Sequence, residues 1–81
     1  MMKNKHNPNG YKVCYREEGK KKYIRHFITY THRQAVAARN GYMRFPPRAR
    51  EDNRLLHNPQ WVIIPIRDSE VRDGIWREAP F

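Results

Sequence analysis

Two sets of side chains alternate along residues 11–16, where Tyr11, Val13 and Tyr15 are followed in turn by a lysine, a cysteine and an arginine. A period of two is typical of a strand with two different faces. Residues 23–30 are β-branched and aromatic, which favours a second strand. Gly19 lies between them and can supply the positive φ that a hairpin loop needs. The pattern therefore predicts a β-hairpin.

The register of this hairpin depends on the length of its loop, and the sequence leaves two alternatives. A four-residue loop sets Val13 opposite Ile24, and a five-residue loop sets Tyr15 opposite Tyr23. A slip of one residue exchanges the buried and exposed faces of the second strand. We favour the five-residue loop, although its apolar face must also carry Arg25. That loop gathers five side chains on one face: Tyr11, Val13, Tyr15, Tyr23 and Phe27.

A helix is predicted to begin at Thr31, because Thr31 and Gln34 have the spacing of a capping box. Residues 35–38 are compact and mostly good helix formers. Gly41 is one end that the sequence suggests, and the alternative is a helix that continues to Phe45. Two prolines follow, and the helix cannot pass them.

Residues 61–66 form the most apolar run of the chain, and their β-branching and short length favour a strand. Pro65 indicates that this strand ends at a sheet edge or a bulge. Residues 68–74 are predicted as a loop or one helical turn. Residues 75–77 either add a short last strand or pack Trp76 onto the sheet.

The order strand, strand, helix, strand predicts an α+β fold, in which a small antiparallel sheet of a hairpin and one or two further strands packs on one helix. The 81 residues lead us to expect one domain, placed at residues 11–81 behind a flexible basic arm at residues 1–10. Nine apolar residues are predicted for the core: Val13, Ile24, Ile28, Val36, Trp61, Ile63, Ile66, Ile75 and Trp76.

The net charge of +9 is unevenly distributed. Residues 1–50 hold 13 Lys and Arg against two Glu, giving +11, and residues 51–81 hold four Arg against six acids, giving −2. A basic half of this kind indicates a polyanionic partner. We expect nucleic acid, and DNA rather than RNA.

The candidate binding residues are the cations of the hairpin and of the helix start. Lysines at a hairpin tip can reach phosphates, and a strand arginine can bind phosphate or a guanine edge. The N–H groups at a helix N-terminus also attract phosphate. Seven residues fit these roles: Lys12, Arg16, Lys20, Lys21, Lys22, Arg25 and Arg33.

A strand, a basic turn, a strand ending in Phe-Ile-Thr and an Ala-rich helix together resemble the arm-type DNA-binding domain of tyrosine-family integrases. The resemblance rests on residues 11–15, 19–22, 27–29 and 34–35, under half of the chain. It implies a sheet that enters the major groove of duplex DNA. Residues 61–76 have no counterpart in that family. The short basic chain also looks like small accessory proteins of phages and conjugative elements.

No enzyme chemistry is predicted. Cys14 with His26 or His32 is the nearest approach to a nucleophile and a base, but a lone strand cysteine is more often a small side chain. The four histidines lack metal-ligand spacing, and no Gly-rich phosphate loop is present. We therefore expect no catalytic residue, metal site, cofactor or small-molecule substrate.

The second hypothesis is a protein-interaction module that uses an aromatic C-terminal surface of Trp61, Trp76 and Phe81. For either function we expect a cytoplasmic protein without a membrane segment. One cysteine suits a reducing compartment, and neither a signal peptide nor a membrane-spanning run is visible.

Overall fold

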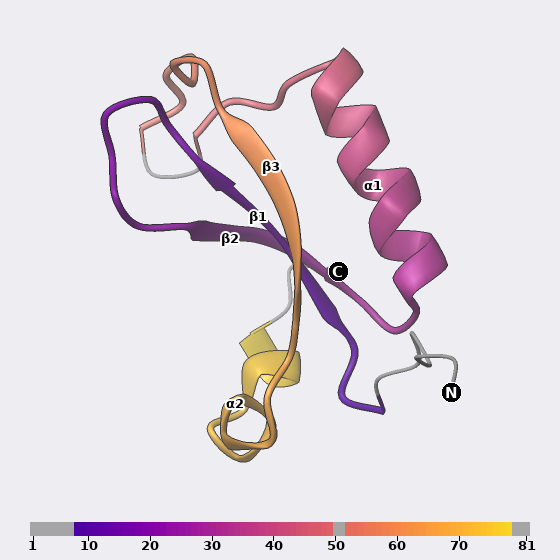
Figure 1. Ribbon diagram of the computed structural model, residues 1–81. Helices are drawn as coiled ribbons and strands as arrows, with labels where there is room; N and C mark the ends of the chain where they lie inside the picture. Colours follow the sequence, from indigo (N-terminus) through magenta and orange to yellow (C-terminus); the bar gives the residue numbers. More distant parts are fainter. Residues whose placement is uncertain (1–7, 50–51, 79–81) are drawn as a thin grey trace.

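The computed structural model describes residues 8–49 and 52–78. In this part of the chain lie the strands β1 (Tyr11–Arg16), β2 (Ile24–Thr29) and β3 (Gln60–Pro65), in the antiparallel order β2-β1-β3. Helix α1 (His32–Arg44) covers one face of the sheet (Figure 1). The short helices α2 (Asp68–Arg72) and η1 (Ile75–Glu78) lie at the end of the sheet away from the hairpin loop. The predicted α+β class is confirmed.

The hairpin register differs from both predicted alternatives. The loop spans residues 17–23, and Tyr15 pairs with Ile24 while Val13 pairs with Phe27. His26 is therefore an extra residue in β2, a β-bulge. The bulge turns both His26 and Phe27 towards α1 and places Arg25 on the opposite face, so the apolar face does not have to carry an arginine.

Helix α1 begins as predicted. The Thr31 hydroxyl accepts a hydrogen bond from the Gln34 N–H at 3.1 Å, and the Gln34 side chain accepts one from the Thr31 N–H at 3.1 Å. The helix passes Gly41 and ends at Arg44, with the Phe45 N–H bonded to the Gly41 carbonyl. Of the two predicted ends, the one near Phe45 is correct.

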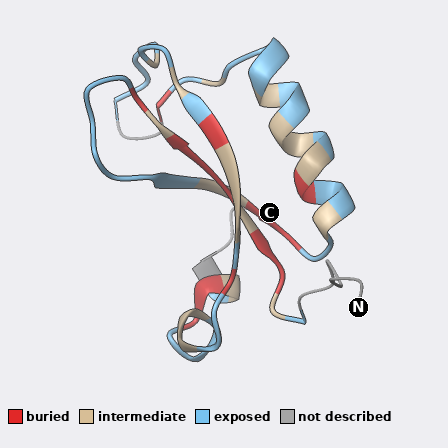
Figure 2. Cartoon of the chain, in the orientation of Figure 1, coloured by how far each residue is buried: buried red, intermediate tan, exposed pale blue. Residues whose placement is uncertain are grey.

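Two apolar clusters lie on opposite faces of the sheet. Figure 2 shows the buried positions along the strands and on α1. Beneath α1, the buried members are Tyr11, Val13, Tyr15, Ala35 and Trp61. On the other face, Ile28, Ile66 and Ile75 form a smaller cluster under α2 and η1, with Trp76 partly buried beside it. Ile24 was predicted for the core but is 41% exposed, because it lies at the loop end of an edge strand.

The two ends of the chain differ from expectation in detail. Residues 75–78 form η1 rather than a last strand, and Trp76 packs against the smaller apolar cluster, which is the other predicted alternative. The centres of the Trp76 and Tyr30 rings lie 4.2 Å apart in a stacked arrangement. Residues 1–7 of the predicted arm lie outside the described residues. Gly10 at its end is buried, and its carbonyl accepts a hydrogen bond from the Ile66 N–H. The folded part therefore begins before Tyr11.

Candidate nucleic-acid interface

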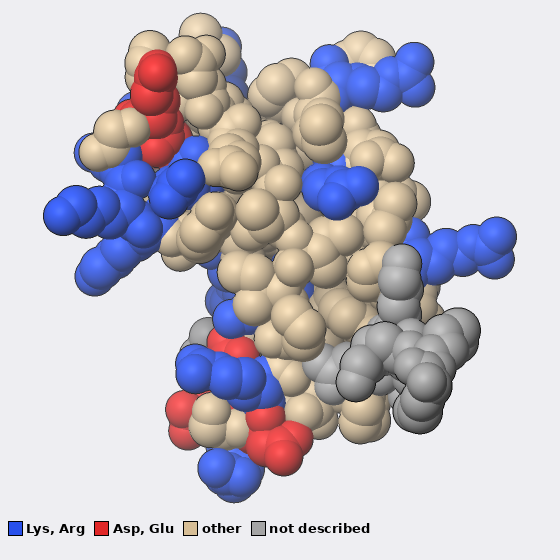
Figure 3. Space-filling view, viewed as in Figure 1, with Lys and Arg blue, Asp and Glu red and all other residues tan. Residues whose placement is uncertain are grey.

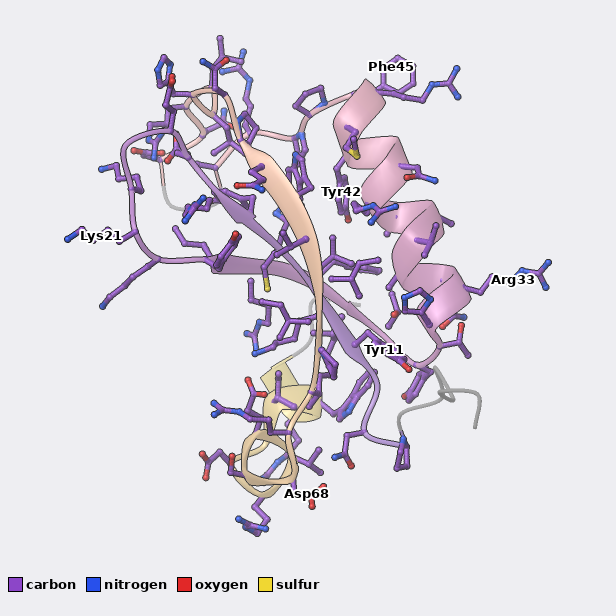
Figure 4. The ribbon with its side chains drawn as sticks, in the orientation of Figure 1. Tyr11, Lys21, Arg33, Tyr42, Phe45 and Asp68 are labelled. Carbon is purple, nitrogen blue, oxygen red and sulfur yellow. The ribbon has the colours of Figure 1, made fainter. Side chains whose placement is uncertain are left out.

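The hairpin loop presents three consecutive lysines to solvent. Its first part is a turn in which the Lys20 N–H bonds to the Glu17 carbonyl at 3.0 Å and Gly19 has φ of 83°. Lys20, Lys21 and Lys22 follow this turn and are all exposed. Figure 3 shows basic side chains gathered on this loop, and Figure 4 shows Lys21 pointing away from the sheet. The loop is therefore a compact source of positive charge.

Glu17, the first acid of the loop, is buried and fully engaged by another segment. The Arg54 guanidinium binds both of its carboxylate oxygens, at 2.7 and 2.6 Å, and the His57 N–H donates at 2.8 Å. These hydrogen bonds, the one from Arg54 first, lower the pKa of Glu17 to about 2. Arg54 is thus the main partner of the Glu17 charge, and Lys20 acts on it only through a weaker electrostatic attraction.

Glu18, the second acid, is held by the same segment. Its carboxylate lies 2.8 Å from the Asn58 side-chain nitrogen and 3.1 Å from His57 Nε2. Among the described residues, no carboxylate forms an ion pair with Lys20, Lys21 or Lys22. The tertiary structure therefore separates the loop lysines from the acids that precede them in the sequence.

A row of planar polar groups crosses the sheet beside this loop. Arg16 in β1 pairs with Gln60 in β3, and Arg16 Nη2 donates to Gln60 Oε1 at 2.9 Å. On its other side, the guanidinium carbon lies 5.1 Å from the centre of the Tyr23 ring. This row faces away from α1, because Arg16 alternates with the buried Tyr15. We call the row and the loop lysines the hairpin surface: Arg16, Lys20, Lys21, Lys22, Tyr23 and Gln60.

A recess of about 290 Å³ opens between the hairpin turn and the start of β3. We call it the hairpin recess. Arg16, Lys20 and Asn58 bring hydrogen-bond donors to it, and Glu18 and Gln60 bring acceptors. A mixture of donors and acceptors distinguishes this recess from the purely cationic loop.

Lys12, another of the predicted binding residues, lies apart from this surface. Its ammonium group forms a 2.7 Å ion pair with Glu70 of α2, and its side chain is 15% exposed. Partial burial raises the pKa of Glu70, but hydrogen bonds from the Arg67 N–H and Lys12 outweigh it and lower that pKa. The sequence did not reveal this partner, which lies 58 residues away.

Arg33 is also remote from the loop. Because β2 runs from the loop to the start of α1, its six residues separate the two by about 20 Å. Figure 4 shows Lys21 and Arg33 on opposite sides of the molecule. The structure therefore places Arg33 and the loop lysines in two separate regions and does not bring them into one cluster.

Arg25 lies on the same face as Arg16. It pairs with Cys14 in β1, and it lines a second recess with Glu70, Asp73 and Ile75. Its side chain is exposed, but the nearby acids of α2 reduce the positive potential there. Of the seven predicted residues, the structure thus brings together Arg16 and the three lysines, with Arg25 at their border.

The groups considered for other chemistry have no reactive arrangement in the described part of the chain. Cys14 is buried, and burial raises the pKa of its thiol, which makes it a poor nucleophile at neutral pH. The described residues contain no cluster of three metal-ligating side chains. Within the same residues, no helix combines the length and apolar character needed to cross a membrane.

The two tryptophans of the second hypothesis lie in different apolar clusters. Trp61 is only 8% exposed and packs against Tyr15 and Tyr42 under α1. Trp76 lies at the other face, stacked on Tyr30. Phe81 lies outside the described residues. Trp61 therefore belongs to the core beneath α1.

Sequence reasoning missed Tyr23 and Gln60 as members of the hairpin surface. An aromatic residue directly after three lysines is a signal that could have identified Tyr23. Gln60 had no such signal, because the antiparallel pairing of β1 with β3 brings it to Arg16 from 44 residues away.

A scan against protein-family models found no match, and neither did searches of curated proteins and of solved structures.

Proposed function

We propose that this protein binds nucleic acid through the hairpin surface. The observation that carries the proposal is the exposure of Lys20, Lys21 and Lys22 beside two acids that are engaged elsewhere. Phosphate groups of any polynucleotide fit such a loop, because unpaired ammonium groups can replace the counterions of the phosphates. The Arg16 guanidinium extends the positive surface onto the sheet.

Two sequence features support DNA as the partner and a role in a mobile genetic element. One is the resemblance of the hairpin and helix to an arm-type integrase domain. The other is the small, basic, single-domain form typical of phage and conjugative accessory proteins. A single cysteine is consistent with the cytoplasmic location predicted from the sequence.

Salt dependence of binding tests this proposal. If about four cations neutralise phosphates, the logarithm of the affinity should fall against the logarithm of salt concentration with a slope near −3 to −4. Replacing Lys20, Lys21 and Lys22 with alanine should weaken binding and flatten that slope by about one to two units.

A matched control removes the same charge from elsewhere. Arg33, Arg44 and Arg72 are exposed and lie outside the hairpin surface. Their replacement with alanine should leave the slope closer to that of the wild type. Equal losses in the two triple variants would show that only net charge matters and would contradict the proposed surface.

A further inference from the structure

The hairpin surface combines two kinds of chemistry, and this combination carries a more specific inference. The three lysines offer only positive charge and donors, which suit phosphates. The hairpin recess beside them also holds two acceptors, the Glu18 carboxylate and the Gln60 carbonyl oxygen. Each already accepts a hydrogen bond, from Asn58 and Arg16 respectively, and each keeps further lone pairs. A second phosphate would be repelled by Glu18, whereas the edge of a nucleobase carries both donors and acceptors.

The size and flatness of the groups around the recess also fit a base. Its volume of about 290 Å³ is close to the lower limit of small-ligand pockets. The guanidinium of Arg16 and the ring of Tyr23 lie next to it as a cation–π pair. Tyr23 is 39% exposed, so part of its ring remains accessible to solvent. Aromatic rings and arginine planes are the usual stacking partners of unpaired bases.

We infer that the hairpin surface binds single-stranded nucleic acid. One unpaired base enters the hairpin recess, a neighbouring base stacks at Tyr23, and the phosphates between them contact the loop lysines. A duplex cannot present a whole base in this way, because its bases are stacked and paired. This inference rests on the proposed function and specifies the form of its ligand.

Fluorescence anisotropy with labelled oligonucleotides tests the inference. The probes are oligo-dT, oligo-rU, an abasic strand and a duplex, each about 12 nucleotides long, which is within the site sizes of single-strand-binding folds. The abasic strand keeps the phosphates and removes the bases. We expect wild-type protein to bind oligo-dT or oligo-rU more tightly than the abasic strand and the duplex. The ratio of oligo-dT to oligo-rU affinity distinguishes DNA from RNA.

Variants of one tyrosine locate the stacking. Tyr23→Ala should weaken binding of the single strands by about 5- to 150-fold, the range that corresponds to one stacked base, and should leave binding of the abasic strand unchanged. Tyr23→Phe keeps the ring and should bind nearly as well as wild type. Tyr30→Ala is the matched control, because Tyr30 is 67% exposed but follows β2 at the end of the sheet away from the loop.

Failure of this inference can be distinguished from failure of the proposed function. If the duplex or the abasic strand binds as tightly as oligo-dT and oligo-rU, and Tyr23→Ala has no effect, the surface binds phosphates without bases and the single-strand inference is overturned. If no probe binds, or the triple lysine variant binds like wild type, the proposed function itself is wrong. Circular dichroism of each variant verifies that the fold is retained.

Discussion

The two faces of the sheet carry different kinds of side chain. The face under α1 is covered by aromatic rings. The centre of the Trp61 ring lies 5.2 Å from that of Tyr15 and 4.9 Å from that of Tyr42. Among the described residues, the apolar cluster of the opposite face lies at the end covered by α2 and η1. At its other end this face carries Arg16 and Tyr23 beside the lysine loop. Alternation along β1 thus separates the groups that stabilise the fold from those proposed to bind nucleic acid.

The comparison predicts that substitution on the face under α1 has the largest effect on stability. Trp61→Ala should lower the free energy of unfolding by about 3–5 kcal/mol, which is enough to leave most molecules of so small a domain unfolded. Trp76→Ala should cost less, because Trp76 is only partly buried. Urea denaturation monitored by circular dichroism measures both. A Trp61→Ala protein as stable as wild type would mean that the face under α1 is not the main core.

The junction between the two faces offers the next largest effect. Gly10 has φ of 91°, and a Cβ there would lie 2.6 Å from both the Thr29 carbonyl oxygen and the Trp76 ring. Gly10→Ala should therefore cost about 2–5 kcal/mol, since positive φ contributes about 1–2 kcal/mol and close contact about 1–3 kcal/mol.

A second glycine provides the control for Gly10. Gly19 has a similar φ of 83°, but a Cβ there meets nothing within 4 Å. Gly19→Ala should thus show the cost of positive φ alone, about 1–2 kcal/mol. Equal losses of stability in the two variants would contradict the close approach of Trp76 and Thr29 to Gly10.

Acid should weaken the contact that holds the hairpin loop to residues 54–57. The pKa of Glu17 is about 2 in the folded protein and about 4.5 when it is unpaired. A lowered pKa means that this stabilisation is present above pH 4.5 and is lost as the pH falls towards 2. The urea midpoint of wild type should decline through this window.

Glu17→Gln isolates this contribution from those of the other carboxylates. The variant should be less stable than wild type at pH 7, and the difference should shrink as the pH falls from about 4.5 to about 2, because protonated Glu17 is neutral as well. A difference that stays constant down to the lowest pH would show that Glu17 titrates normally.

The smallest expected effect on stability belongs to the binding surface. Replacing Lys20, Lys21 and Lys22 with alanine should change the free energy of unfolding by no more than about 0.5 kcal/mol, as exposed side chains without partners usually do. Thermal unfolding measures this. Loss of nucleic-acid binding without loss of stability would confirm that the two faces have separate roles, and strong destabilisation would contradict it.

Much of the fold was predictable because its signals are local. Alternation identified β1, a run of β-branched residues identified β3, and the spacing of Thr31 and Gln34 identified the start of α1. The hairpin register was not predictable. It depends on a bulge at His26 and on a loop whose acids bind residues 54–58, and neither has a local pattern.

The candidate site was predictable only in part, for a related reason. A run of three lysines after a turn glycine marks an exposed cationic loop wherever the rest of the chain lies. Whether a strand cation joins that loop depends on what covers its face of the sheet. Lys12 and Arg16 both face away from α1, yet α2 pairs Lys12 with Glu70 and leaves Arg16 at the open end.

The sequence by itself determined the main elements and their order, the cationic loop, and the difference in net charge between the two halves of the chain. Each of these depends on residues a few positions apart, whose spacing matches the period of a strand, a helix turn or a tight turn. Only the tertiary structure decided which charges remain available. Glu17 meets Arg54 across 37 residues and Lys12 meets Glu70 across 58, and pairing at such separations follows from strand and helix packing.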